Sequence, residues 1–292
     1  MDQKKNVKDK LIGITSNVIV DRIGLQGYQL IKNAGFESID FNLQRGFFLP
    51  ERNGFPNDFI NIIKRHKDSI MASGLIVSQT HAPYYTCESY ISSKESLENY
   101  FNAVRIALMA TIELKCERFV IHPLHTYGWM NTNEAELTYS LVESISDIAK
   151  KSGVHICLEN LPYNFCGNVS THKAFLSMLR KYDVKGCFDV GHAKICDESP
   201  IIHMRQMRKD IFAVHIHDND GKRDLHNGIK ANDDFWKLII EEAKKNKNVI
   251  SLSLETSGIY KNCDIGSIPK ELKMDYMSIN NLMGTNTEGM LR

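Results

Sequence analysis

The stretch 211-IFAVHIHDNDGKRDLHNG-228 carries a short apolar run that ends in three histidines and three aspartates. Parallel strands are covered on both faces and read as apolar runs, so residues 211–214 are typical of the end of a buried strand. The polar residues then lie on the loop after that strand. The alternative is a solvated loop that binds nothing, and the stretch taken alone does not separate the two.

The composition argues against several classes of protein. A chain of 292 residues suits one large domain or two small ones, and barrels of roughly 250 residues are common. The net charge of +1, from 36 basic and 35 acidic residues, makes nucleic acid an unexpected partner. The seven cysteines form no CxxC pair, which favours reduced thiols and an intracellular protein. No stretch reaches the roughly 20 apolar residues of a membrane span, so we expect a soluble, cytoplasmic protein.

Short β-branched runs alternate with longer amphipathic stretches from Leu11 onward, which is the pattern of βα units around a parallel sheet. The predicted strands span residues 11–15, 38–42, 76–81, 118–123, 155–160, 186–192, 212–218 and 250–256, and clear helices span 57–74, 94–115 and 134–153. Eight units without a linker predict a single domain over residues 1–292, folded as an α/β protein of the (β/α)8 TIM barrel type. We expect a flexible charged segment at residues 1–10 and a frayed tail after about residue 275.

Side chains with metal-binding and proton-transfer chemistry recur at the predicted strand ends. They are His81, His122, Glu159, Asp189, His192, His215, His217 and Glu255, and Asp224 and His226 follow on the seventh loop. In a barrel the carboxyl ends of the strands meet at one rim, where the active site lies. Several carboxylates buried together need a cation or protons to compensate them, and imidazole with carboxylate suits a divalent first-row metal. The sequence therefore predicts a metal site at this rim.

At this point the chain resembles a known family, the xylose isomerase-like TIM barrels, which include sugar phosphate isomerases and epimerases and the endonuclease IV group. The matching stretches are 80-THAPYY-85, 121-IHP-123, 158-LEN-160, 188-FDVGHA-193, 215-HIHDNDGKRDLH-226 and 254-LET-256. In the ketose 3-epimerase branch, the resemblance implies one metal held by Glu159, Asp189, His215 and Glu255. It also implies that Glu159 and Glu255 are the catalytic acid and base on opposite sides of a bound sugar, and that His192 holds a substrate oxygen.

The endonuclease IV branch implies a different centre. There His81, His122, His192, Asp224 and His226 would join the same four residues and bind three zinc ions. Epimerase-like members often retain many of these ligands, so the ligands alone do not settle the activity. The chain departs from the family after His226, where Asn227 and Gly228 replace the usual Pro-Gly-x-Gly turn. That departure changes the turn directly after Asp224 and His226.

These observations favour a divalent-metal-dependent isomerase or epimerase that acts on a sugar, sugar phosphate or polyol by proton transfer next to a carbonyl. Zinc or manganese is the expected metal, with magnesium and cobalt as further candidates. The alternatives are a zinc-dependent phosphodiesterase of abasic DNA and a barrel that binds a ligand without turnover. We expect His81, His192, Tyr84 and Trp129 to contact the substrate, whereas His217, Asp218 and Asp220 support the site or are solvated.

Overall fold

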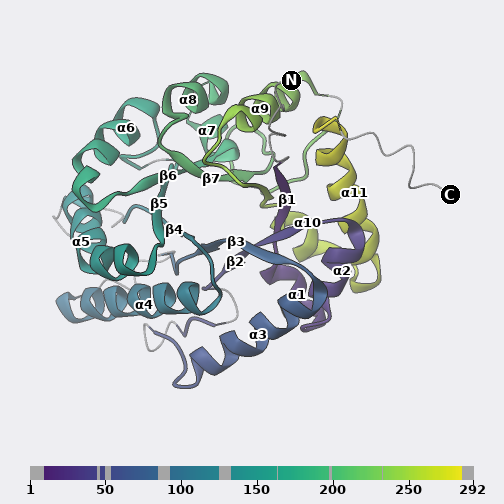
Figure 1. The fold of residues 1–292 in the computed structure, drawn as a ribbon. Coiled ribbons are helices and arrows are strands. Elements are labelled where there is room, and N and C mark those ends of the chain that lie inside the picture. The colour runs from purple at the N-terminus through teal and green to yellow at the C-terminus, as the bar shows by residue number, and fades with distance from the viewer. Residues whose placement is uncertain are drawn as a thin grey trace, which may run out of the picture.

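Eight parallel strands close into a barrel in chain order, and β1 lies beside β8 (Figure 1). The computed structural model describes residues 10–44, 47–49, 54–84, 93–124, 133–162, 164–196, 199–231 and 233–284. The strands are β1 (Leu11–Thr15), β2 (Ser38–Asn42), β3 (Ile76–His81), β4 (Arg118–Ile121), β5 (His155–Glu159), β6 (Lys185–Asp189), β7 (Ile211–Ile216) and β8 (Ser251–Leu254). The predicted (β/α)8 fold is confirmed.

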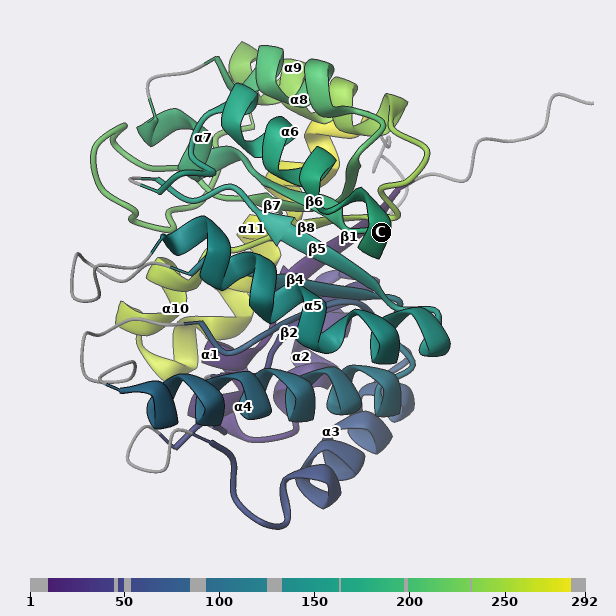
Figure 2. The ribbon, with the colours of Figure 1, turned by 90° about the vertical axis from the view of Figure 1, so that its left-hand side faces the viewer.

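Helices surround the barrel, and the short helices α7 and α10 lie at the end where the strands finish (Figure 2). The helices are α1 (Asn17–Ile23), α2 (Gly27–Ala34), α3 (Phe59–Ser73), α4 (Lys94–Glu113), α5 (Glu134–Ser152), α6 (Val169–Met178), α7 (Val190–Ile195), α8 (Pro200–Met207), α9 (Asp234–Lys245), α10 (Ser257–Asn262) and α11 (Ile268–Leu282). The expected glycine stops are present, since α3 ends at Gly74 and α5 at Gly153, with φ of 73° and 70°. None of the helices in the described part of the chain is long and apolar enough to cross a membrane.

The core has two parts. The larger part lies between the strands and the helices, where side chains such as Phe119, Leu158 and Trp236 are fully buried. The smaller part fills the barrel interior with Val120, Cys157, Cys187 and Ala213. The cysteines of the described residues are free thiols. The packed interior leaves the rim as the place where polar side chains gather.

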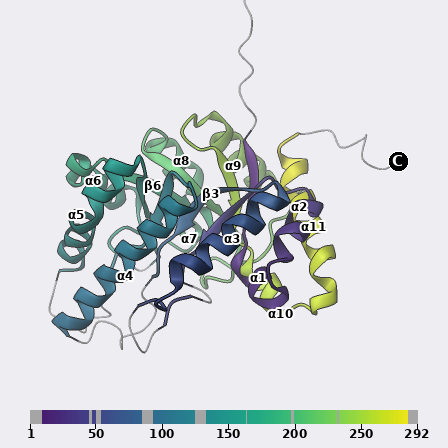
Figure 3. The same ribbon diagram turned by 60° about the horizontal axis from the view of Figure 1, so that its bottom comes forward.

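The expectation of a frayed tail is wrong for residues 276–282, which continue α11. Leu272, Asp275 and Ile279 form the buried side of this helix, and Tyr276 packs edge-on against Phe36 with ring centroids 5.5 Å apart. Figure 3 shows α11 beside α2. The polar Asp275 interrupts the apolar stripe and hides the helical period in the sequence. Residues 1–9 of the predicted flexible segment 1–10 and the last eight residues, 285–292, lie outside the described ranges.

Candidate metal centre

The ends of four strands bring together Glu159, Asp189, His215 and Glu255, here called the central cluster. Asp189 and His215 are direct partners across β6 and β7. The Nδ1 of His215 lies 3.0 Å from Oε1 of Glu159 and 3.1 Å from Oε2 of Glu255. It lies 3.7 Å from Oδ2 of Asp189. One potential ligand atom from each of the four residues lies within 4.8 Å of all the others, so a single cation could contact all four.

Glu159 is shared with a second group, formed by His81 at the end of β3 and His122 just after β4. Its Oε2 lies 3.2 Å from Nε2 of His81 and 3.1 Å from Nε2 of His122. Its Oε1 faces His215 and, at 3.3 Å, the Nδ1 of His192. Burial alone would raise the pKa of Glu159, but the nearby His215 and His122 hold that pKa well below its ordinary value. Both oxygens of this buried carboxylate are therefore engaged.

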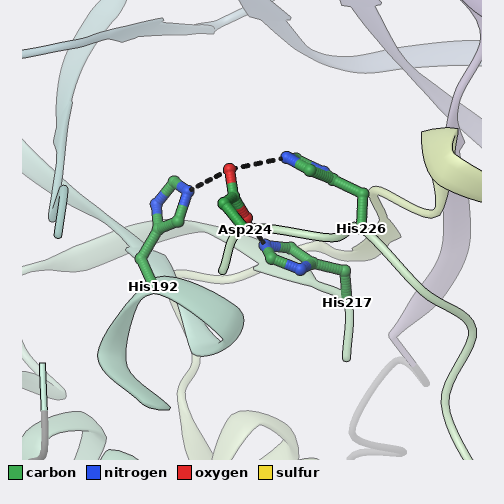
Figure 4. Close-up of side chains that lie close together, drawn as sticks. All are labelled: His192, His217, Asp224 and His226. Atoms are coloured by element: carbon green, nitrogen blue, oxygen red, sulfur yellow. Dashed lines mark hydrogen bonds and ion pairs between the residues drawn. The ribbon is translucent and has the colours of Figure 1, made fainter. Parts of the chain in front are cut away.

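A third group, here called the loop cluster, consists of His192, His217, Asp224 and His226 (Figure 4). His192 lies on the first turn of α7 rather than on a strand, because β6 ends at Asp189. The Oδ1 of Asp189 accepts a hydrogen bond of 2.7 Å from the backbone N–H of His192 and so begins the helix. The sequence motif that predicted one long strand over 186–192 is a strand followed by a helix.

The loop after β7 has a definite shape despite its departure from the family turn. Asp218 and Asn227 form an antiparallel bridge with two backbone hydrogen bonds of 2.8 and 2.9 Å. His226 takes a positive φ of 49°, and its carbonyl accepts the backbone N–H of Gly258 at 3.2 Å. A Cβ at Gly258 would lie 2.4 Å from the carbonyl oxygen of Leu225. The bridge and the glycine of α10 together direct Asp224 and His226 toward α7.

Three histidines are oriented by the backbone. The Nδ1 atoms of His81, His192 and His226 lie 2.8, 2.9 and 2.8 Å from the carbonyl oxygens of Ala82, Asn160 and Glu255. An Nδ1–H that donates to a carbonyl leaves the Nε2 lone pair free for a cation. In each case Nε2 faces an acidic side chain of the site, Glu159 for His81 and Asp224 for the other two.

The buried charges of the site balance one another. Burial lowers the pKa of His192 and of His215, yet the pKa of each lies well above its ordinary value. The neighbours that outweigh burial are led by Asp189 for His192, and by Cys187, Glu159 and Glu255 for His215. Burial would raise the pKa of Asp189, but His192 and His217 lower it. Asp189 Oδ2 is nevertheless buried without a hydrogen-bond partner. Such an orphaned oxygen is costly unless a cation meets it, which fits a metal centre.

The sequence reasoning missed Asp40, and it named His217 only as a residue that supports the site or is solvated. Asp40 on β2 is 1% exposed, and its Oδ2 lies 3.1 Å from Nε2 of His215. Its Oδ1 is buried without a hydrogen-bond partner. His217 is fully buried rather than solvated. The signal for Asp40 was a carboxylate in the middle of a predicted buried strand, and the signal for His217 was its two-residue spacing from His215, which places both on one side of an extended chain.

The remaining predicted residues differ in where they lie. Tyr84 packs against His81 and His122, with ring centroids 5.4 and 4.9 Å apart, and so lines the rim. Trp129 lies outside the described residues. Asp218 pairs with Lys194, and Asp220 pairs with the exposed Arg223 at 2.8 Å. These two aspartates hold the loop rather than the site.

The chain belongs to the xylose isomerase-like TIM barrel family, whose model matches residues 28–270. The uncharacterized protein MJ1311 of Methanocaldococcus jannaschii is 24% identical over 291 residues, which cover 96% of this chain and 94% of that protein.

Solved structures of similar fold carry sugar epimerase names. D-psicose 3-epimerase of Clostridium cellulolyticum H10, solved with D-tagatose, superposes with a TM-score of 0.70 and 15% identity, covering 93% of this chain and 99% of that one. A D-tagatose 3-epimerase-like protein superposes with a TM-score of 0.68 and 20% identity, covering 93% of this chain and 98% of that one. L-ribulose 3-epimerase superposes with a TM-score of 0.67 and 16% identity, covering 96% of this chain and 99% of that one. This chain therefore has the fold of these solved sugar epimerase structures.

Proposed function

We propose that this protein is a divalent-metal-dependent isomerase or epimerase that acts on a sugar or sugar phosphate. The observation that carries the proposal is the central cluster, in which two glutamates flank the Nδ1 of one buried histidine at 3.0 and 3.1 Å. Glu159 is 1% exposed, whereas the side chain of Glu255 is 15% exposed and reaches the open rim. The Glu255 carboxylate is thus partly open to the rim, and the Glu159 carboxylate is buried.

The central cluster would hold the metal, with Glu159, Asp189, His215 and Glu255 as ligands. Its imidazole and carboxylate donors suit zinc or manganese. A divalent ion bound there would polarise a substrate carbonyl and stabilise the negative charge that develops beside it.

The side chains would supply the proton transfers. One of the two glutamates, Glu159 or Glu255, would accept the proton from the carbon next to the carbonyl, and the other would return a proton on the opposite face. Tyr84 gives an aromatic wall for the sugar, since it already covers His81 and His122. His81 fixes the position of Glu159 through its Nε2 and remains a predicted contact of the substrate.

The test is solvent exchange at carbon. The metal-loaded protein is incubated with ketoses, aldoses and their phosphates in D2O, and NMR follows deuterium next to the carbonyl and the appearance of an epimer or isomer. We expect Glu255→Gln and Glu159→Gln each to lose about 10²-fold or more of the turnover, because each removes a proton carrier. Asp68→Asn, a change at an exposed residue of α3, serves as the control. Full activity in both glutamine variants would refute the assignment.

A second function is favoured by one specific observation, the sharing of Glu159 between two groups of potential ligands. A carboxylate between two cations is the arrangement of a hydrolytic centre that attacks phosphate esters. A zinc-dependent phosphodiesterase of abasic DNA is therefore the alternative. Chelator-sensitive incision of an abasic duplex, with no deuterium exchange into any sugar, would replace the first proposal with this one.

A further inference from the structure

His217 is a buried histidine that the proposed proton-transfer chemistry does not use. Its side chain is fully buried, and neither ring nitrogen has a hydrogen-bond partner. Its Nε2 lies 3.1 Å from Oδ1 of Asp189 and 3.6 Å from Oδ1 of Asp224. A buried imidazole without hydrogen bonds is costly, so its position requires a compensating partner.

The fold makes room for this ring. A Cβ at Gly191, on the first turn of α7, would lie only 2.1 to 2.5 Å from three atoms of the His217 imidazole. The glycine therefore lets α7 approach the end of β7 with the ring between them. Asn219 fixes the same contact, since its side-chain amide donates to the carbonyl of Gly191 at 2.7 Å.

The Nε2 of His217 faces Asp224, as do His192 and His226 (Figure 4). The Oδ2 of Asp224 lies 3.4 Å from Nε2 of His192 and 2.9 Å from Nε2 of His226. All four ligand atoms of the loop cluster lie within 4.8 Å of one another. Ligand atoms of a tetrahedral zinc site, with bonds of about 2.0 to 2.1 Å, stand about 3.3 Å apart, and the distances from Asp224 to the three histidines, 2.9 to 3.6 Å, lie near this value.

We propose that His192, His217, Asp224 and His226 bind one zinc ion through four protein ligands, and that this ion is structural. The family resemblance implies only three of these ligands, and His217 adds the fourth. Structural zinc sites are closed by four protein ligands, whereas catalytic sites keep an open position. The ion would fasten the loop after β7 to α7 and take no part in the reaction.

The proposal goes beyond the proposed function and does not depend on it. It changes the role of His192, which would contact the cation instead of a substrate oxygen. It also removes the open third cation that the phosphodiesterase alternative would use. Proton transfer at the central cluster can be present or absent with either outcome, so the two proposals fail separately.

The experiment uses the 292-residue chain loaded with Co2+ and freed of excess metal, because tetrahedral Co2+ absorbs visible light far more strongly than six-coordinate Co2+. Metal per chain is measured by elemental analysis, and zinc affinity by competition with a chelator. We expect the wild type to show the strong absorption. His217→Ala should lose it together with one metal per chain, or weaken zinc binding at that site by at least about tenfold.

Two further variants make the result specific. Gly191→Ala keeps all four ligands but places a methyl group on the His217 ring, so it should weaken the same site. Glu255→Gln alters the central cluster and should keep the strong absorption. If circular dichroism shows that His217→Ala does not fold, His217→Gln takes its place, and its Co2+ absorption and metal content are compared with those of the wild type. A wild type without tetrahedral Co2+ absorption, or a folded His217 variant with unchanged metal content and affinity, would overturn the proposal.

Discussion

At the residue scale, Asp40 and His215 form a buried pair behind the central cluster. The Nδ1 of His215 faces three carboxylates, and its Nε2 faces Oδ2 of Asp40 at 3.1 Å. Gln79 also holds this oxygen, by a hydrogen bond of 3.2 Å. A carboxylate behind a ligating histidine orients the ring and raises its basicity. If His215 binds the metal as proposed, Asp40 would act through it as a positioning residue.

Replacing the Asp40 carboxylate with an amide should weaken metal binding without creating a cavity in the core. Asp40→Asn keeps the shape of the side chain but removes its charge, so we expect the affinity of the central cluster for zinc or manganese to fall about 10- to 100-fold. Isothermal titration measures the affinity, and the exposed Asp68→Asn is the matched control. Unchanged affinity in Asp40→Asn would show that the pair serves packing alone.

At the scale of elements, α11 is tied to the loop after β8 through Asp275. Thr256 and Tyr260 both donate hydrogen bonds to Oδ2 of Asp275, at 2.6 and 2.7 Å. Burial raises the pKa of Asp275 to about 6, although the two hydrogen bonds act in the opposite direction. Because Thr256 follows Glu255 directly, this contact supports the strand end that carries the accessible glutamate.

The raised pKa of Asp275 predicts a pH dependence of stability. The folded state holds the proton up to about pH 6, whereas the unfolded carboxyl loses it near 3.9. The stabilisation is thus complete below about pH 4 and is lost as the pH rises to 6, by about 3 kcal/mol. Asp275→Asn should remove this loss, so its free energy of unfolding relative to the wild type should rise between pH 4 and 6. Parallel pH profiles from urea unfolding would contradict the prediction.

The strands and helices also show which parts of the fold and of the candidate site could be predicted from the sequence. Buried parallel strands read as apolar runs, so their positions and the polar residues at their ends were predictable. His192 was misplaced because Val190 continues the apolar run of β6 while the backbone already turns into α7. Asp40 and His217 gained their roles only from neighbours on other strands and helices, which a linear pattern does not contain. The helix over residues 276–282 was missed because its burial depends on the contact with α2.

At the scale of the whole molecule, the barrel gathers the carboxylates and imidazoles of β2 to β8 in one buried region. The dense charge at the rim makes the stability of the fold depend on what neutralises it. A divalent cation that binds the folded state alone stabilises it by mass action, by about 2.7 kcal/mol at 100 times its Kd. For a chain of 292 residues, with an unfolding entropy of about 2.1 cal/mol/K per residue, that corresponds to a rise in Tm of about 4 °C.

Protons and cations compete for the same side chains, so the stabilisation by zinc should depend on pH. Burial opposes protonation of His226, but Glu255 and Asp224 raise its pKa to about 9. In protein stripped by a chelator, this contribution to stability is complete below about pH 6.5 and is lost as the pH rises through 9. Zinc needs the neutral imidazole, so the Tm difference between zinc-loaded and stripped protein should grow from pH 6.5 to 9. Calorimetry at fixed free zinc measures it, and His217→Ala should show a smaller increase. A difference that stays constant or shrinks over this range would mean that no cation replaces these protons.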